Sequence, residues 1–184
     1  MPKEGFSIDD LLNPKPRRYQ DDFIEKPLRE KASNGVTEAR RILNTLKFKG
    51  PPIPLEPVSE YLGAYIVIVD TIKNNPKAVG CHLGDGHIEI KKGLHKNLYR
   101  STLAHELGHL ALCHDIRSKW HEADSYKDPD PHEREAWAFA GELLIPDRML
   151  RPMFNHNPNP NSLAGIFKVS SDFLWVQLDK RKYI

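Results

Sequence analysis

The feature that most constrains the fold is the segment 101–114, STLAHELGHLALCH, which is apolar over nearly its whole circumference when it is drawn as a helix. We expect a helix that begins near Leu98 or Ser101, ends around His114 and is buried on all sides. A buried helix does not carry two imidazoles and a carboxylate without partners, because each unpaired polar group costs several kcal/mol. The polar side chains of this segment therefore predict a site.

Those side chains are His105, Glu106 and His109. The two histidines are four residues apart, so their rings lie on one face of the helix and can converge on one ion. Glu106 points beside that ion, where a water molecule would sit. Catalytic zinc takes about three protein ligands and keeps one position open. The spacing predicts a Zn²⁺ site with His105 and His109 as ligands and Glu106 as the catalytic residue; the alternative is a structural histidine pair.

A third ligand is expected from a second helix over residues 132–144, HEREAWAFAGELL. Glu135 lies at the edge of the apolar face of this helix, so we expect it to point inward. Glu133 and Glu142 project more toward solvent in the same projection. Because buried charges are paired or coordinate metals, Glu135 is the predicted metal ligand. Glu133 and His132 stay open as alternatives.

The surrounding chain predicts an α+β fold, with a zincin-like core in which the helix that carries the site packs on a small twisted sheet. Strands are expected at residues 65–69, 78–83 and 87–90, with a Gly84-Asp85-Gly86 turn between the last two. The last of them offers an edge for an extended peptide or is an ordinary sheet strand. Further helices are expected at 37–47, capped by Thr37, at 57–62, and in a C-terminal pair at 162–168 and 171–179, with a linker at 155–161.

We therefore divide the chain into an N-terminal arm (1–34), a zinc metallopeptidase core (35–150), and a linker with a C-terminal helical appendage (151–184). The formal net charge of +2 is too small to indicate a nucleic-acid surface, so direct DNA binding is not expected. The sequence shows no signal peptide and no apolar stretch long enough to span a membrane. Cys81 and Cys113 suit a reducing compartment, and we expect a cytoplasmic protein.

Two motifs resemble the ImmA/IrrE family: R-x-T-L-A-H-E-L-G-H at residues 100–109, and E-A-x-x-F-A-x-x-L-L-x-P at residues 135–146. The resemblance covers roughly residues 36–178. Family members commonly have Asn where Trp137 stands and Met where Ile145 stands; these departures affect packing more than ligands, although Trp137 can reshape the pocket. The resemblance implies a zinc metallopeptidase linked to phage-type repressors. It also implies that the C-terminal pair corresponds to the helix-turn-helix that follows the peptidase core.

The leading hypothesis is a zinc-dependent endopeptidase that hydrolyses a peptide bond in a helix-turn-helix transcriptional repressor and so regulates transcription. Its alternative is a non-catalytic zinc-containing regulator or toxin-like module that acts by protein–protein binding. The presence of Glu106 argues against that alternative, because a purely structural site needs no general base. Possible donors to an oxyanion are Tyr126, His132 and His82. A second metal at His114 and His121 is less expected than two solvated loop residues.

Overall fold

Four strands form one mixed sheet in the computed structural model, in the order β1-β3-β2-β4. Strand β1 (Tyr65–Val69) pairs parallel with β3 (His87–Lys91), and β2 (Ala78–Gly84) pairs antiparallel with both β3 and the short β4 (His121–Glu122). The strands and the helices described below confirm the predicted α+β class. Each of the three longer strands lies within one residue of its predicted bounds.

The structure describes residues 34–72, 75–114, 121–122 and 130–184, all of which belong to one compact unit, Lys31–Ile184. The expected arm, apart from Asn34, lies outside the described residues, as do Tyr126 and most of the segment between residues 115 and 129. In the described part of the chain, no helix has the length and apolar character needed to cross a membrane.

The β2–β3 hairpin turns through three residues with positive φ, Gly84, Asp85 and Gly86, as the sequence predicted. Its register places His82 opposite Ile88. Side chains of directly opposed residues lie on the same face of a sheet, and Ile88 belongs to the main hydrophobic core. His82 therefore points toward that core, while Cys81 points to the other face.

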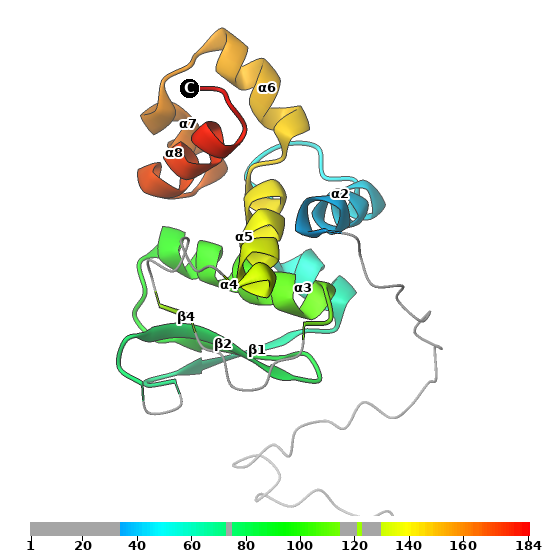
Figure 1. Cartoon of the computed structure of the whole chain (residues 1–184), viewed down its shortest axis with the longest axis vertical. Helices are drawn as coiled ribbons and strands as arrows, with labels where there is room; N and C mark the ends of the chain where they lie inside the picture. Colours follow the sequence, from blue (N-terminus) through cyan, green and yellow to red (C-terminus); the bar gives the residue numbers. More distant parts are fainter. Residues whose placement is uncertain (1–33, 73–74, 115–120, 123–129) are drawn as a thin grey trace, which may run out of the picture. The chain divides into compact units, whose positions relative to one another are not determined.

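Helix α5 (Pro131–Leu144) packs against α2 (Gly35–Leu46) on one side and against α4 (Lys96–Ala111) on another, and α4 in turn covers β2 and β3 (Figure 1). The α4–α5 contact is close: a Cβ atom on Gly108 would lie 3.0 Å from the carbonyl oxygen of Ala136. Asn34, and not the predicted Thr37, caps α2, since its side chain accepts a hydrogen bond from the Thr37 amide at 2.8 Å.

The remaining helices are α3 (Glu56–Leu62), α6 (Asp147–His156), α7 (Pro160–Phe167) and α8 (Ser171–Lys180). Helix α6 was not predicted, and it occupies the start of the expected 155–161 linker. Pro152 lies inside it, and a proline argues against a helix at that point of the sequence. Its apolar side chains nevertheless recur at helical spacing and lie in or against the main core: Met149, Leu150, Met153 and Phe154.

The C-terminal helices α7 and α8 share one hydrophobic core with α2, α4 and α5. Phe167 and Phe173 are fully buried in it. Polar contacts add to this packing, because Asn97 donates to the carbonyl of Val169 at 2.9 Å and Arg181 donates to the carbonyl of Ile145 at 2.7 Å. The expected boundary at residue 150 therefore crosses a continuous core, and the division into core and appendage remains a prediction.

Candidate metal centre

Helix α4 carries the three predicted residues of the site. His105 is fully buried, and Glu106 is 2% exposed. The Nε2 atoms of His105 and His109 face each other at 3.0 Å, which is the convergence that the i, i+4 spacing predicts. The helix is apolar around them, as expected, so the two imidazoles meet in a part of the molecule from which water is largely excluded.

The carboxylate that meets these histidines belongs to Glu133, in the first turn of α5. Its Oε2 atom lies 3.1 Å from Nε2 of His105, and its Oε1 atom lies 3.3 Å from Nε2 of His109. One ligand atom from each of the three residues lies within 4.8 Å of the other two. The described residues thus bring two ring nitrogens and one carboxylate to a common point.

Glu135 is not part of this cluster, which differs from the prediction made for the third ligand. Its side chain is 41% exposed and its Oε2 atom lies 3.5 Å from Nε2 of His114. The expectation that Glu133 and Glu142 face solvent was wrong, since each is only 4% exposed. The reason is that α5 is covered by α2 and by α4, so it has two buried sides where the projection assumed one apolar face.

The three side chains fit a zinc ion. Two histidines, one carboxylate and an open fourth position make a typical catalytic zinc set. Bonds of about 2.0–2.1 Å in tetrahedral geometry separate ligand atoms by about 3.3–3.4 Å. The two Nε2 atoms lie 3.0 Å apart, and each lies at a similar distance from one oxygen of Glu133, Oε2 at 3.1 Å or Oε1 at 3.3 Å. The carboxylate is also held in its ionised form. Burial raises the pKa of Glu133, but hydrogen bonds and charges of His105 and His109 outweigh it, and the pKa lies below its ordinary value.

Two further rings contact the histidines of the site. The indole ring of Trp137 lies against the imidazole of His105, with ring centroids 4.1 Å apart. His114, just past the end of α4, places its Nδ1 atom 3.0 Å from Nδ1 of His109. The prediction that His114 is a solvated loop residue was wrong, since the residue is 7% exposed. Burial, followed by the charges of His109 and His132, lowers the pKa of His114 to about 4.

Of the three expected oxyanion donors, His82 lies in the most suitable place. It points toward the core from β2 and is 3% exposed, and neither ring nitrogen has a hydrogen-bond partner among the described residues. Burial lowers its pKa, and the charges of Glu106 and His109 also act on it, which places it near the site. The side chain of His132 is 53% exposed, and Tyr126 lies outside the described residues.

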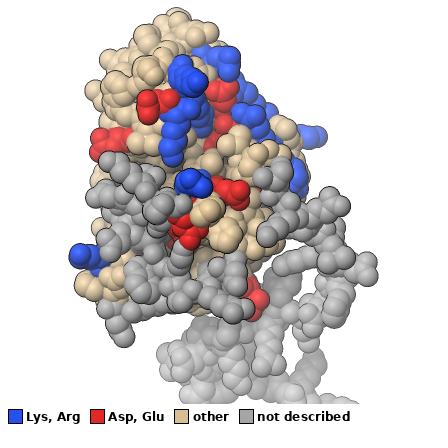
Figure 2. All heavy atoms as spheres, in the orientation of Figure 1, with Lys and Arg blue, Asp and Glu red and all other residues tan. Residues whose placement is uncertain are grey.

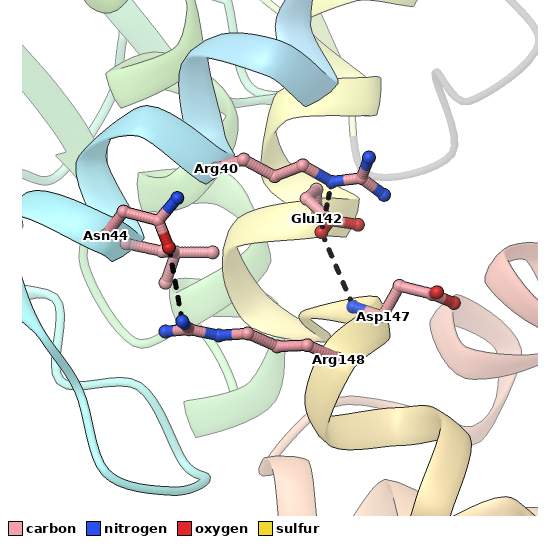
Figure 3. Close-up of a pocket in the computed structure, with 6 residues that line it drawn as sticks. Arg40, Asn44, Glu142, Asp147 and Arg148 are labelled. Carbon is pink, nitrogen blue, oxygen red and sulfur yellow. Dashed lines mark hydrogen bonds and ion pairs between the residues drawn. The ribbon is translucent and has the colours of Figure 1, made fainter.

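A pocket lies away from this centre, between α2, α5 and α6 (Figure 3). It has a volume of about 310 Å³ and contains charged side chains that already pair with one another. Arg40 donates to Glu142 at 2.9 Å, and Arg148 donates to Asn44 at 3.2 Å. Glu142 also lies 3.6 Å from Arg181 of the segment that follows α8. We interpret this cluster as a structural joint between α2, α5 and the C-terminal segment.

Comparison with known proteins places the chain in a class. Residues 59–178 match the peptidase family described as the IrrE N-terminal-like domain. The match covers more than half of the sequence, so the chain belongs to this family, which confirms the resemblance found in the two motifs.

The fold also resembles that of a solved Mycobacterium tuberculosis transcriptional regulator, with a TM-score of 0.55 and 16% sequence identity over 76% of this chain. The present chain spans 44% of the length of that protein. At this identity the likeness concerns the fold alone. Comparison with the sequences of curated proteins gives no match.

Proposed function

We propose that this chain is a zinc-dependent endopeptidase with His105, His109 and Glu133 as metal ligands and Glu106 as general base. The observation that carries the proposal is the meeting of the three ligand side chains at 3.0–3.3 Å. The next residue after His105, Glu106, is a buried carboxylate that is not one of the three. Membership of a peptidase family supports peptide hydrolysis as the reaction. A purely structural site would need no such additional carboxylate.

Zinc bound here would lower the pKa of a water molecule and polarise the scissile carbonyl. The chain's own residues supply the remaining steps. Glu106 would take the proton from the attacking water and return it to the leaving amine nitrogen. Glu106 follows His105 directly on the buried helix α4. The packing of α4 against α5 holds the Glu133 carboxylate opposite the Nε2 atoms of both histidines.

His82 is our candidate for the donor to the developing oxyanion. A neutral imidazole carries one N–H, and the lowered pKa of this buried ring keeps it neutral. Neither nitrogen has a hydrogen-bond partner among the described residues, so the donor is free to meet a substrate carbonyl oxygen. Preorganised donors of this kind contribute strongly because their orientation is fixed before the reaction.

For the substrate we propose a helix-turn-helix transcriptional repressor in the cytoplasm. This rests on the resemblance to proteins linked to repressors and is consistent with a regulator as the fold neighbour. A protein partner also suits the surface better than DNA does. Figure 2 shows Asp and Glu side chains among the Lys and Arg side chains on this face, so the positive charge is not continuous, and the formal net charge is +2.

The decisive experiment replaces Glu106 and follows zinc and cleavage separately. Glu106→Gln should keep about one zinc per chain and the fold, because the residue is not a ligand, and should lower the cleavage rate by about 10²–10⁴. The protein would be incubated with a candidate repressor, such as a helix-turn-helix protein encoded beside it, and fragments identified by mass spectrometry. A Glu106→Gln variant that relieves repression as well as the parent would favour the non-catalytic regulator instead.

A matched pair on α5 tests the ligand assignment. Glu133→Ala should lose zinc, while Glu135→Ala should still hold about one zinc per chain, because only Glu133 meets the histidines. Elemental analysis of the purified variants measures this directly. Loss of zinc from Glu135→Ala together with full retention in Glu133→Ala would reverse the assignment.

A further inference from the structure

The C-terminal end of α4 brings a third histidine back onto the site. Cys113 adopts a left-handed conformation with φ of 53°. The amide of the next residue, His114, then donates to the carbonyl of His109 at 3.1 Å, and the Cys113 amide donates to the carbonyl of Leu110 at 3.3 Å. This pair of bonds is a Schellman motif. The motif commonly brings an apolar residue into contact with the last helical turn; here it brings two imidazoles together.

The two rings meet through specific atoms. Nδ1 of His109 lies 3.0 Å from Nδ1 of His114, while Nε2 of His109 is the atom that faces His105 and Glu133. On its other side, Nε2 of His114 lies 3.5 Å from Oε2 of Glu135. A continuous path of polar contacts therefore runs from Glu135 through His114 to a residue of the metal centre.

Proton counting gives this path a direction. A neutral imidazole carries one N–H and one lone pair. A nitrogen that binds a metal must present its lone pair, so Nε2 of His109 leaves the proton on Nδ1. Nδ1 of His114 must then accept, which leaves its proton on Nε2, facing the Glu135 carboxylate. Each nitrogen on the path has a complementary partner, and a carboxylate acceptor stands at the end.

We infer that His114 and Glu135 are positioning residues of the metal centre, which fix the ring orientation and the tautomer of His109. The inference rests on the proposed metal site and deepens it. Metal-binding histidines usually donate their second N–H to a carboxylate, carbonyl or water, and loss of such a partner weakens metal binding by about 10–100-fold. Here a second imidazole stands between the histidine and the carboxylate. Glu135, which was predicted as a metal ligand, thus acts on the metal centre through His114.

The first test needs no substrate. In the zinc-loaded, ¹⁵N-labelled full-length chain, two-bond ¹H–¹⁵N correlations at neutral pH report which ring nitrogen of each histidine carries the proton. The parent should show His109 as the Nδ1–H form and His114 as the Nε2–H form. A parent in which His114 carries its proton on Nδ1 would overturn the inference.

The second test measures zinc affinity by competition with a chromophoric chelator. His114→Ala should bind zinc about 10–100-fold more weakly. His114→Asn should restore most of the affinity, because its amide oxygen can accept the Nδ1–H of His109. Glu135→Gln should lower the zinc affinity less, by roughly twofold to fivefold, since the contact between Glu135 and His114 is long and partly exposed. His132→Ala is the matched control: its ring lies 4.5 Å from that of His114 but takes no part in the path, so its affinity should equal the parent's.

The outcomes separate this inference from the proposed function. A parent that binds zinc but cleaves no repressor would refute the proposed activity and leave the positioning role intact. A parent that binds no zinc would refute the metal site and, with it, this inference. Equal zinc affinity in His114→Ala and the parent, or equal losses in the Ala and Asn variants, would show that His114 only fills space. If His114→Ala does not fold, His114→Phe replaces it in the affinity measurement, because its ring fills the space but cannot accept a hydrogen bond.

Discussion

Trp137 packs its indole ring against the imidazole of His105, with centroids 4.1 Å apart and planes inclined by 35°. The tryptophan is 3% exposed, and its ring also lies 6.3 Å from that of Phe173 on α8. One side chain therefore joins the metal centre, helix α5 and a C-terminal helix. The indole thus provides a packing surface beside the metal centre.

Trp137→Ala should consequently destabilise the protein by about 3–5 kcal/mol, as expected for removal of a large buried aromatic side chain. Trp137→Phe keeps an aromatic ring in the cavity and should cost less than half of that. Urea unfolding in the presence of a chelator measures the free energy of unfolding without the contribution of bound metal. Equal unfolding midpoints for Trp137→Ala and the parent would show that the indole adds no stability.

The close contact between α4 and α5 depends on Gly108. An added Cβ atom would lie 3.0 Å from the carbonyl oxygen and 3.1 Å from the Cα atom of Ala136, and backbone atoms cannot move aside cheaply. Gly108→Ala should therefore push the helices apart, at a cost of about 1–3 kcal/mol. It should also weaken zinc binding, because His109 lies on α4 and Glu133 on α5, and the change would move these two residues apart.

Gly165 on α7 is the matched control for this change. It is also a helical glycine, but a Cβ atom there meets nothing within 4 Å. Gly165→Ala should stabilise the protein by about 0.5–1 kcal/mol through helix propensity. Thermal unfolding and zinc competition would measure the stability and the zinc affinity of both variants. A Gly108→Ala protein as stable as Gly165→Ala would contradict the importance of the close contact between α4 and α5.

The sequence predicted the part of the site that lies within one helix and missed the parts that need tertiary structure. The four-residue spacing of His105 and His109 is a local property, and it was sufficient to predict their convergence. The choice between Glu133 and Glu135 depends on which sides of α5 are covered, and the propensity of a single helix cannot show that both α2 and α4 pack on it. His114 was missed because its burial results from a chain reversal at Cys113, a non-glycine residue that gives no turn signal.

Asp147 should make stability depend on pH. Burial raises the pKa of its carboxyl group, but hydrogen bonds from Arg151 at 2.9 Å and Tyr183 at 2.8 Å, with the arginine charges, lower it below the ordinary 3.8. A lowered pKa in the folded state stabilises the protein above the unfolded value, and this contribution is lost as the pH falls through the folded value. Asp147→Asn should thus be less stable than the parent at pH 7 and approach it below pH 3.8.

Thermal unfolding across this pH range would measure the effect. The control is Asp179→Asn, which removes an exposed carboxylate on α8 and should leave the pH dependence of the parent unchanged. A stability difference between Asp147→Asn and the parent that stays constant down to the lowest pH would exclude an ionised Asp147 as its source.

His82 should show opposite effects on stability and on activity. A buried polar group without a hydrogen-bond partner costs roughly 1–3 kcal/mol, and the described residues offer neither ring nitrogen a partner. His82→Leu should therefore leave the protein as stable as the parent or more stable. If the ring donates to the oxyanion, the same change should lower the cleavage rate by about 10²–10³, the usual loss for one such donor. Zinc stoichiometry should not change, since His82 is outside the cluster of possible ligands.

The neighbouring Cys81 supplies the control for this variant. It is fully buried on the same strand but packs on the opposite face, with Ile72 and Ala78. Cys81→Ala should reduce stability through the loss of a buried side chain and leave the cleavage rate per folded molecule unchanged. Both variants would be measured by urea unfolding and by the appearance of repressor fragments. These measurements distinguish a loss of stability in β2 from the loss of a hydrogen-bond donor to the oxyanion. A His82→Leu enzyme that cleaves at the parental rate would remove His82 from the mechanism and leave the segment 115–129, with Tyr126, as the next place to search.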